Sequence, residues 1–232
     1  MSAQARDAVL GRLRRALGRG RDTSALRRAI DERLRQPQAD LVPARGDLDR
    51  LGRLRLFTAQ AEAVQTTVRR VDRYHTLPRA VAGYLRQHNL PLQLVVATDP
   101  VLAGVDWPGG ILEVRHGRPR DGDAVGLTTA YAGIAETGTL MLLSAPETPT
   151  TLAFLPETSL VVLPAERILR AYEDGLALLR HEHGALPRSI NFITGPSRSG
   201  DIEQTLQLGA HGPRRLCVLV VEEPVRDDRS AT

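Results

Sequence analysis

The spacing of apolar residues predicts helices in the first third of the chain. Leucine, valine, isoleucine and alanine recur every three or four positions over residues 2–17 and 24–34, which places them on one face of each helix. The same spacing continues through residues 47–71 and predicts a longer helix, and a shorter one is predicted from Leu77 to Gln87. Residues 36–46 have the composition of a linker.

Two arrangements fit the apolar stripe of residues 47–71. The helix can pack on the core of its own chain, or it can form a seam with a partner chain. We favour the first, because three heptads is the least that indicates a coiled coil. The arginine-rich faces of the N-terminal helices are expected to be solvated, and docking to an acidic partner or a membrane surface is the alternative.

From Leu92 onward the pattern changes to short, continuous apolar runs, which are typical of strands buried on both faces. Seven runs qualify as strands: residues 92–97, 111–114, 124–130, 140–143, 160–163, 190–193 and 216–221. A further helix is predicted from Ile168 to the stop at Gly184. The pattern predicts an α/β fold, with an open, mostly parallel sheet covered by helices and preceded by N-terminal helices.

Length and composition fit one main domain with a small appendage. Of the 232 residues, 42% are hydrophobic, which is enough for one sizeable core. We divide the chain into a helical segment with its linker at residues 1–45, an α/β domain at 46–223 and a charged tail at 224–232. The tail is expected to fray.

Charge and cysteine content exclude several classes of protein. The 31 basic residues, all arginine, barely exceed the 27 acidic ones, and only 3% of residues are aromatic, so a nucleic-acid-binding surface is not indicated. Cys217 is the single cysteine and lies in an apolar run, so it cannot support an intramolecular disulfide or a self-contained iron–sulfur cluster, which takes about four thiolates. No apolar run approaches the ~18 residues of a membrane span, and no signal-peptide core opens the chain. We expect a cytoplasmic protein.

Polar residues are densest directly after the run 190–193. Ser197, Arg198, Ser199, Asp201 and Glu203 fall within seven positions. We expect a polar loop, a short helix beginning near Ser199 and then the strand 216–221, an order by which an open α/β sheet presents a ligand at the carboxyl ends of its strands. A connection with a purely structural role is the alternative.

A second candidate lies in the connection before the run 140–143. Glu136 is flanked there by the small residues Ala135, Thr137 and Gly138, which let a ligand approach closely. Its carboxylate could act as a base, a nucleophile or a hydrogen-bond acceptor, and a solvated glutamate in a hairpin turn is the alternative. The chain contains no phosphate-binding loop, no dinucleotide fingerprint and no nucleophile elbow.

The histidines give weak signals. His181 and His183 lie two positions apart and therefore do not share a helix face, so metal ligation is not favoured. His211, in the turn of residues 209–213, is a candidate proton acceptor, with a surface hydrogen bond as the alternative.

Two long motifs resemble a known family. They are Gly-Ile-Ala-Glu-Thr-Gly-Thr at 133–139 and Phe-Ile-Thr-Gly-Pro-Ser-Arg-Ser-Gly-Asp-Ile-Glu at 192–203, followed by Gly-Ala-His-Gly-Pro at 209–213. Their order and separation resemble the lactate utilization protein C family, the LutC/YkgG or LUD-domain group, over about residues 45–223. The resemblance implies a fold like the NagB/RpiA/CoA-transferase group. It also implies a role in oxidising L-lactate to pyruvate, beside two partner proteins that carry iron–sulfur clusters.

The resemblance also implies a set of site residues. Those matching the family motifs are Glu136, Thr137, Gly138, Gly195, Ser197, Arg198, Asp201 and Glu203. We expect Arg198 to bind a small carboxylate and Glu136, or less favourably His211, to accept a proton. Asp201 and Glu203 would repel a phosphate at the same place. No cofactor is expected on this chain, and iron–sulfur clusters are expected on its partners.

Three functions remain open. The leading hypothesis is an accessory or substrate-handling subunit of an iron–sulfur lactate oxidation system. The second is an independent enzyme, either an acyl-CoA transferase with Glu136 as nucleophile or a sugar-phosphate isomerase. The third is an interaction module that binds a partner through the helix of residues 47–71.

Overall fold

The computed structural model describes residues 3–18, 24–35, 42–183, 186–202, 205–209 and 211–225. The chain divides into two compact units, Met1–Val42 and Pro43–Thr232. Most of the expected linker, the tail after residue 225 and Glu203 lie outside the described residues.

The first unit consists of helices α1 (Ala3–Ala16) and α2 (Ser24–Arg35), as the apolar spacing predicts. Most apolar side chains of both stripes are about half exposed or more, with Leu13 at 53% and Ile30 at 47%, whereas Leu10 is partly buried. No described side chain of α2 is buried. Each stripe therefore faces solvent in this chain.

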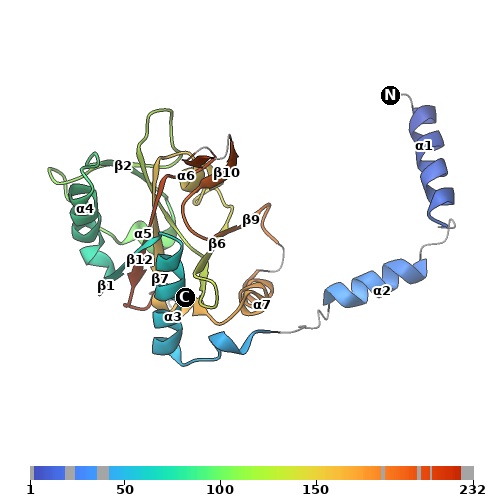
Figure 1. The fold of residues 1–232 in the computed structure, drawn as a ribbon, viewed down its shortest axis with the longest axis horizontal. Helices are drawn as coiled ribbons and strands as arrows, with labels where there is room; N and C mark the ends of the chain where they lie inside the picture. Colours follow the sequence, from blue (N-terminus) through green and yellow to red (C-terminus); the bar gives the residue numbers. More distant parts are fainter. Residues whose placement is uncertain are drawn as a thin grey trace, which may run out of the picture. The chain divides into compact units, whose positions relative to one another are not determined.

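Six parallel strands form the main sheet of the second unit (Figure 1). In spatial order they are β1 (Thr67–Val71), β12 (Arg215–Val221), β7 (Thr158–Pro164), β4 (Val125–Thr129), β2 (Gln93–Val96) and β3 (Glu113–His116). Every neighbouring pair runs parallel. The predicted open parallel sheet covered by helices is confirmed.

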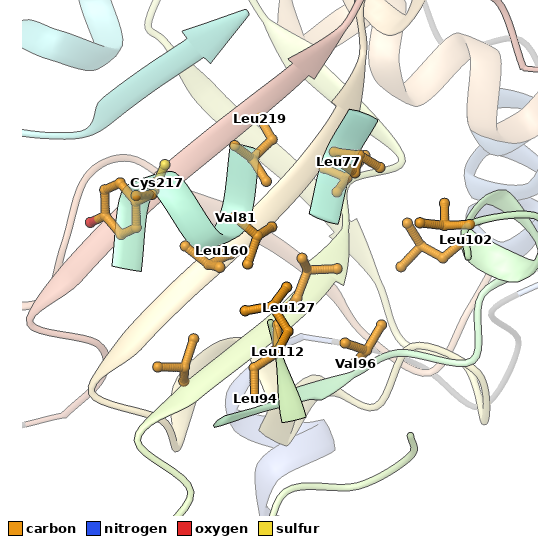
Figure 2. Packing of buried hydrophobic residues seen from close by; sticks show 14 of the residues in the cluster. Leu77, Val81, Leu94, Val96, Leu102, Leu112, Leu127, Leu160, Cys217 and Leu219 are labelled. Carbon is orange, nitrogen blue, oxygen red and sulfur yellow. The ribbon is translucent and has the colours of Figure 1, made fainter. Parts of the chain in front are cut away.

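Both faces of the main sheet are buried, which explains the continuous apolar runs. In β12, Cys217 and Leu219 belong to one core cluster, whereas Val218 and Val220 belong to another. Helix α4 (Leu77–Gln87), which matches its predicted bounds, covers the first face, and Figure 2 shows its Leu77 and Val81 over the strand side chains. Each fully buried leucine contributes about 1.5–3 kcal/mol.

Helix α3 (Arg50–Ala63) and a second, four-stranded sheet cover the opposite face. The second sheet has the order β8 (Ile168–Leu169), β5 (Ala132–Ile134), β6 (Thr139–Leu143), β9 (Ile190–Ile193). Its central pair and the β6–β9 pair are antiparallel. Helix α7 (Tyr172–Glu182) packs on the outside of this sheet, where Leu179 meets Met141. The runs 140–143 and 190–193 are therefore strands, but not strands of the main sheet.

The remaining elements are short. They are the helices α5 (Pro100–Ala103) and α6 (Thr150–Phe154), the 3-10 turns η1 (Ala44–Gly46), η2 (Tyr74–Thr76) and η3 (Ala165–Arg167), and an antiparallel hairpin of β10 (Arg198–Ile202) and β11 (Thr205–Leu208).

The long helix predicted for residues 47–71 is wrong beyond Ala63. The Asp49 side chain caps α3 by accepting a 2.7 Å hydrogen bond from the Gly52 N–H. Gln65 adopts a positive φ of 68°, which a helix cannot contain, and Val68 then pairs with Val218 in β12. Leu54, Phe57 and Ala61 of α3 are buried in the core, so the expected packing of this helix on its own chain is confirmed, although Leu51 near its start is 46% exposed.

Two other helix predictions need correction. The short helix expected from Ser199 is wrong, because residues 198–202 and 205–208 pair as the antiparallel strands β10 and β11. The helix expected from Ile168 begins at Tyr172, because Ile168 and Leu169 pair with β5 as strand β8. In both places the residues pair with another strand, although their local sequence pattern is compatible with a helix.

Candidate functional site

Glycines of the two motifs pack against the same helix. Gly138 has a φ of 65°, and a Cβ built on it would lie 2.3 Å from the Ala61 nitrogen of α3. Gly195 has a φ of 86°, and its Cβ would lie 2.8 Å from the Val64 carbonyl oxygen at the end of α3. Only glycine fits such a conformation and such an approach, so the backbone of each motif lies directly on the helix.

Hydroxyl groups join the two motifs in space. Thr139 Oγ1 lies 2.7 Å from Thr137 Oγ1, 2.9 Å from the Tyr172 hydroxyl and 2.6 Å from Thr194 Oγ1. Thr139 is fully buried, so its bonds stand in for water. Together with Gly138 and Gly195 these four residues form what we term the motif cluster. It brings the predicted residues Thr137, Gly138 and Gly195 together.

The polar residues after Gly195 lie at the amino end of β12, not at its carboxyl end. The Ser197 N–H donates to the Pro213 carbonyl at 2.9 Å, two residues before β12 begins. Arg198 is exposed, and its Nη2 donates to the Val64 carbonyl oxygen at 2.9 Å. His211 is exposed in the turn before β12. The expected site at the carboxyl ends of the main sheet is therefore not where this loop lies.

Glu136 lies apart from these groups. Its side chain is 4% exposed and faces Arg45, whose Nε lies 3.6 Å from Oε2. That oxygen has no hydrogen-bond partner among the described residues, and no bond or ion pair described there links Glu136 to Arg198 or His211. A nucleophile must reach its substrate, so burial disfavours that role for Glu136. The Asp201 side chain and Glu203 lie outside what the structure describes, and their predicted roles stay predictions.

A cavity of about 620 Å³ opens at the carboxyl edge of the main sheet. Its lining includes residues at the carboxyl ends of β4 and β7, Thr129 and Pro164, and Asp99, which lies three positions after β2. Strands β4 and β2 are neighbours in this sheet. After β2 the chain continues to β3 on one side of this pair, whereas after β4 the next strand of the sheet is β7 on the other side. The cavity therefore lies at the topological switch point, where open α/β sheets characteristically bind ligands.

A charged cluster forms one wall of the cavity. Arg167 Nη1 donates to Glu182 at 2.9 Å, and the Tyr131 hydroxyl donates to the same carboxylate at 2.8 Å. The Arg167 guanidinium also lies 5.3 Å from the Tyr131 ring centre. Partial burial opposes ionisation of Glu182, but the hydrogen bonds from Arg167 and Tyr131 outweigh it and lower the pKa of the carboxyl. Burial, followed by the bond to Glu182, raises the pKa of the Tyr131 phenol.

Asp99 forms the other polar wall. Its Oδ1 accepts a 2.8 Å hydrogen bond from the Val101 N–H and caps α5, and its Oδ2 accepts from the Thr129 hydroxyl at the end of β4. An ionised carboxylate has about four acceptor positions. Asp99 is half-buried beside the cavity and keeps acceptor capacity for a ligand.

Sequence reasoning missed this cavity, although a signal was present. Asp99 lies three positions after the end of strand β2, and polar side chains that follow buried parallel strands gather at one edge of the sheet. Arg167 and Glu182 carried no comparable signal, because 15 positions separate them. Among the described residues, no three His, Cys, Asp or Glu side chains are grouped as metal ligands would be. None of the described helices has the length and apolar character to cross a bilayer.

Comparisons with known proteins place the chain in a family. The model of the LUD domain family matches residues 123–221. An uncharacterized protein of Neisseria meningitidis is 36% identical over 96 residues, which cover 41% of each chain, so the match spans less than half of that relative. The lactate utilization protein C of Geobacillus thermodenitrificans is 30% identical over 95% of this chain and 97% of its own length.

A solved structure supports the fold. The crystal structure of a DUF162 family protein from Deinococcus radiodurans superposes with a TM-score of 0.58, covers 75% of this chain and 99% of its own, and is 24% identical. At that identity the likeness shows the fold alone. The near-full-length relative shows that this chain belongs to the lactate utilization protein C family, and residues 123–221 match the LUD domain.

Proposed function

We propose that this chain serves lactate utilization, as a subunit that handles a small carboxylate while iron–sulfur partner proteins carry the electrons. One observation carries the proposal: the relation to the Geobacillus thermodenitrificans lactate utilization protein C extends over 95% of this chain at 30% identity. A match of that extent covers both units and not the LUD domain alone.

The cysteine content supports placing the iron–sulfur centres on partners. Oxidation of L-lactate to pyruvate releases two electrons and two protons, which need an acceptor. The chain has one cysteine, Cys217, and burial raises the pKa of its thiol to about 12. A cluster ligand must be a thiolate, and a cluster takes about four of them. This chain therefore offers no ligand set for such a cluster.

Arg198 is the candidate for the carboxylate. Its guanidinium is exposed and one amino group is held by the Val64 carbonyl oxygen, which fixes the side chain at the end of α3. The remaining N–H groups suit a carboxylate, because a guanidinium presents its donors in a fork that matches two oxygens.

Reconstitution tests the electron-carrying part of the proposal. The purified chain is mixed anaerobically with iron–sulfur partner subunits of a lactate utilization system, and L-lactate-dependent reduction of a dye is followed. We expect no turnover by the chain alone and turnover only when all subunits are present. Lactate oxidation by the chain alone would contradict the accessory role, and so would equal activity of the partners without it.

Calorimetry tests the carboxylate site. L-lactate and pyruvate are titrated into the purified chain and into Arg198→Ala, with Arg86→Ala, an exposed arginine of α4, as the matched control. Binding that only Arg198→Ala removes supports the proposed site. If lactate still binds to Arg198→Ala, its carboxylate binds at a site other than Arg198. In the reconstituted assay, loss of all turnover in Glu136→Gln, with partner binding intact, would instead favour an enzyme acting through Glu136.

A further inference from the structure

The cavity at the switch point has the size of a ligand site. Its volume of about 620 Å³ lies within the range of 300–1,000 Å³ typical of small-molecule pockets, and it is several times the space that one lactate ion fills. It is separate from the motif cluster, because none of the cluster residues lines it. A ligand of this cavity would therefore be held by groups other than those of the motif cluster.

One wall of the cavity is apolar and relatively rigid. Three prolines, two valines and a leucine form it: Pro100, Pro164, Pro187, Val101, Val225 and Leu143. The Tyr131 ring, held between Arg167 and the edge of His183, adds a flat surface. Such a wall suits a flat ring system, because proline, branched and aromatic side chains lose little entropy when a ring packs on them.

The polar groups favour a ligand that donates hydrogen bonds. Two carboxylates, Asp99 and Glu182, line the cavity together with the imidazole of His183 and one guanidinium, that of Arg167, which is already paired with Glu182. The acceptors of Asp99 at the end of β2 are therefore not neutralised by a cation in this wall. In dinucleotide-binding α/β sheets an acidic residue near a strand end accepts hydrogen bonds from ribose hydroxyl groups, and Asp99 offers the same kind of acceptor here, whereas an anion placed against it would be repelled.

We propose that this cavity binds a nucleoside-bearing ligand, whose ribose hydroxyls donate to Asp99 and whose base packs on the wall of prolines, valines and Leu143. The chain has no glycine-rich phosphate loop, so the nucleoside part supplies the recognition and any phosphate extends toward solvent. Thr129 holds the Asp99 carboxylate in place, and the Tyr131–Arg167–Glu182 cluster closes the far wall. The assignment stands apart from the proposed lactate role.

Calorimetric titration of the full chain tests the site with adenosine, 2′,3′-dideoxyadenosine and L-lactate. We expect adenosine to bind and the dideoxy compound, which lacks both hydroxyls, to bind at least ~10-fold more weakly. Asp99→Asn should weaken adenosine binding by a similar factor, while asparagine still caps α5. Asp174→Asn, which alters a carboxylate paired with Arg170 outside the cavity, should leave binding unchanged.

A substitution that fills the cavity with a larger side chain provides a second test, which leaves the charges of the cavity unchanged. Ala145 is exposed at the cavity, and Ala145→Phe should abolish adenosine binding without loss of folding, whereas Ala177→Phe on the exposed face of α7 should not. Adenosine that fails to bind, or binds equally to Asp99→Asn and Ala145→Phe, would overturn the proposal. So would L-lactate binding that depends on Asp99 while adenosine does not bind. None of these measurements depends on the reconstituted lactate oxidation assay. The nucleoside site and the lactate role can therefore be disproved independently of each other.

Discussion

The motif cluster and the switch-point cavity are built in opposite ways. The cluster is densely packed: Gly138 and Gly195 lie against the backbone of α3, and Thr139 within it is fully buried. The cavity is hollow, and polar groups of Asp99, Arg167 and Glu182 line a space of about 620 Å³. Gly138, Thr139 and Gly195 of the sequence motifs are explained by close packing, whereas the open space is lined by residues that lie far apart in the sequence.

The largest effect should come from filling the closest approach in the cluster. Gly138→Ala forces a Cβ to within 2.3 Å of the Ala61 nitrogen at a φ of 65°, so strain and overpacking add. We expect a loss of about 3 kcal/mol or more in the free energy of unfolding, measured by denaturant titration. Gly104→Ala is the control, because no atom lies within 4 Å of its Cβ position. Equal stability of the two variants would show that the cluster is not closely packed.

A smaller effect should follow removal of the hydroxyl that joins the motifs. Thr139→Val leaves the hydroxyls of Thr137, Thr194 and Tyr172 with one partner fewer, and should cost about 1–2 kcal/mol in chemical denaturation. Thr66→Val is a matched control, because the buried Thr66 hydroxyl has no partner among the described residues. That substitution should be neutral or stabilising. If Thr139→Val is as stable as the parent, the hydrogen bonds among these hydroxyl groups do not contribute to the stability of the fold.

At the cavity, stability should depend on the helix cap and not on charge. Asp99→Ala removes the acceptor for the Val101 N–H and should cost about 1 kcal/mol, whereas Asp99→Asn retains it and should cost roughly 0.5 kcal/mol or less. Thermal unfolding of the two variants measures the difference. A large loss in Asp99→Asn would mean that the carboxylate charge serves the fold, which would weaken its assignment to a ligand.

The smallest effect concerns pH. The pKa of Glu182 is lowered in the folded chain, because the bonds from Arg167 and Tyr131 outweigh its partial burial, so its stabilising contribution is present at neutral pH and lost as the pH falls through that lowered pKa. Glu182→Gln should therefore be less stable than the parent at pH 7, by no more than about 1 kcal/mol for so exposed a pair, and equally stable in acid. Melting temperatures of both proteins from pH 7 to pH 3 check this. A difference that persists into acid would contradict the ionised pair.

Local pattern predicted the elements of the chain well where one period dominated. Helix α4 has its predicted bounds. Four of the seven apolar runs are inner strands of the main sheet, where burial on both faces leaves a continuous apolar run, and a fifth overlaps the edge strand β3 at residues 113 and 114. The prediction from local pattern failed where residues with helical spacing pair with another strand instead. Residues 67–71 continue the apolar stripe of α3, yet they pair with β12, which supplies hydrogen bonds and burial that an extended helix there would lack.

The sequence by itself therefore determined the fold class, the helical N-terminal unit and the two motifs that mark the family. Only the tertiary structure decided that these motifs meet through Thr139 and Thr194, that Glu136 is buried beside Arg45, and that the loop of Arg198 lies at the amino end of β12. It also decided the cavity, because the order of strands in the sheet, and not their order along the chain, brings Asp99, Thr129 and Arg167 around one space. Local spacing fixes periodicity, but long-range pairing fixes which ends of the strands are neighbours.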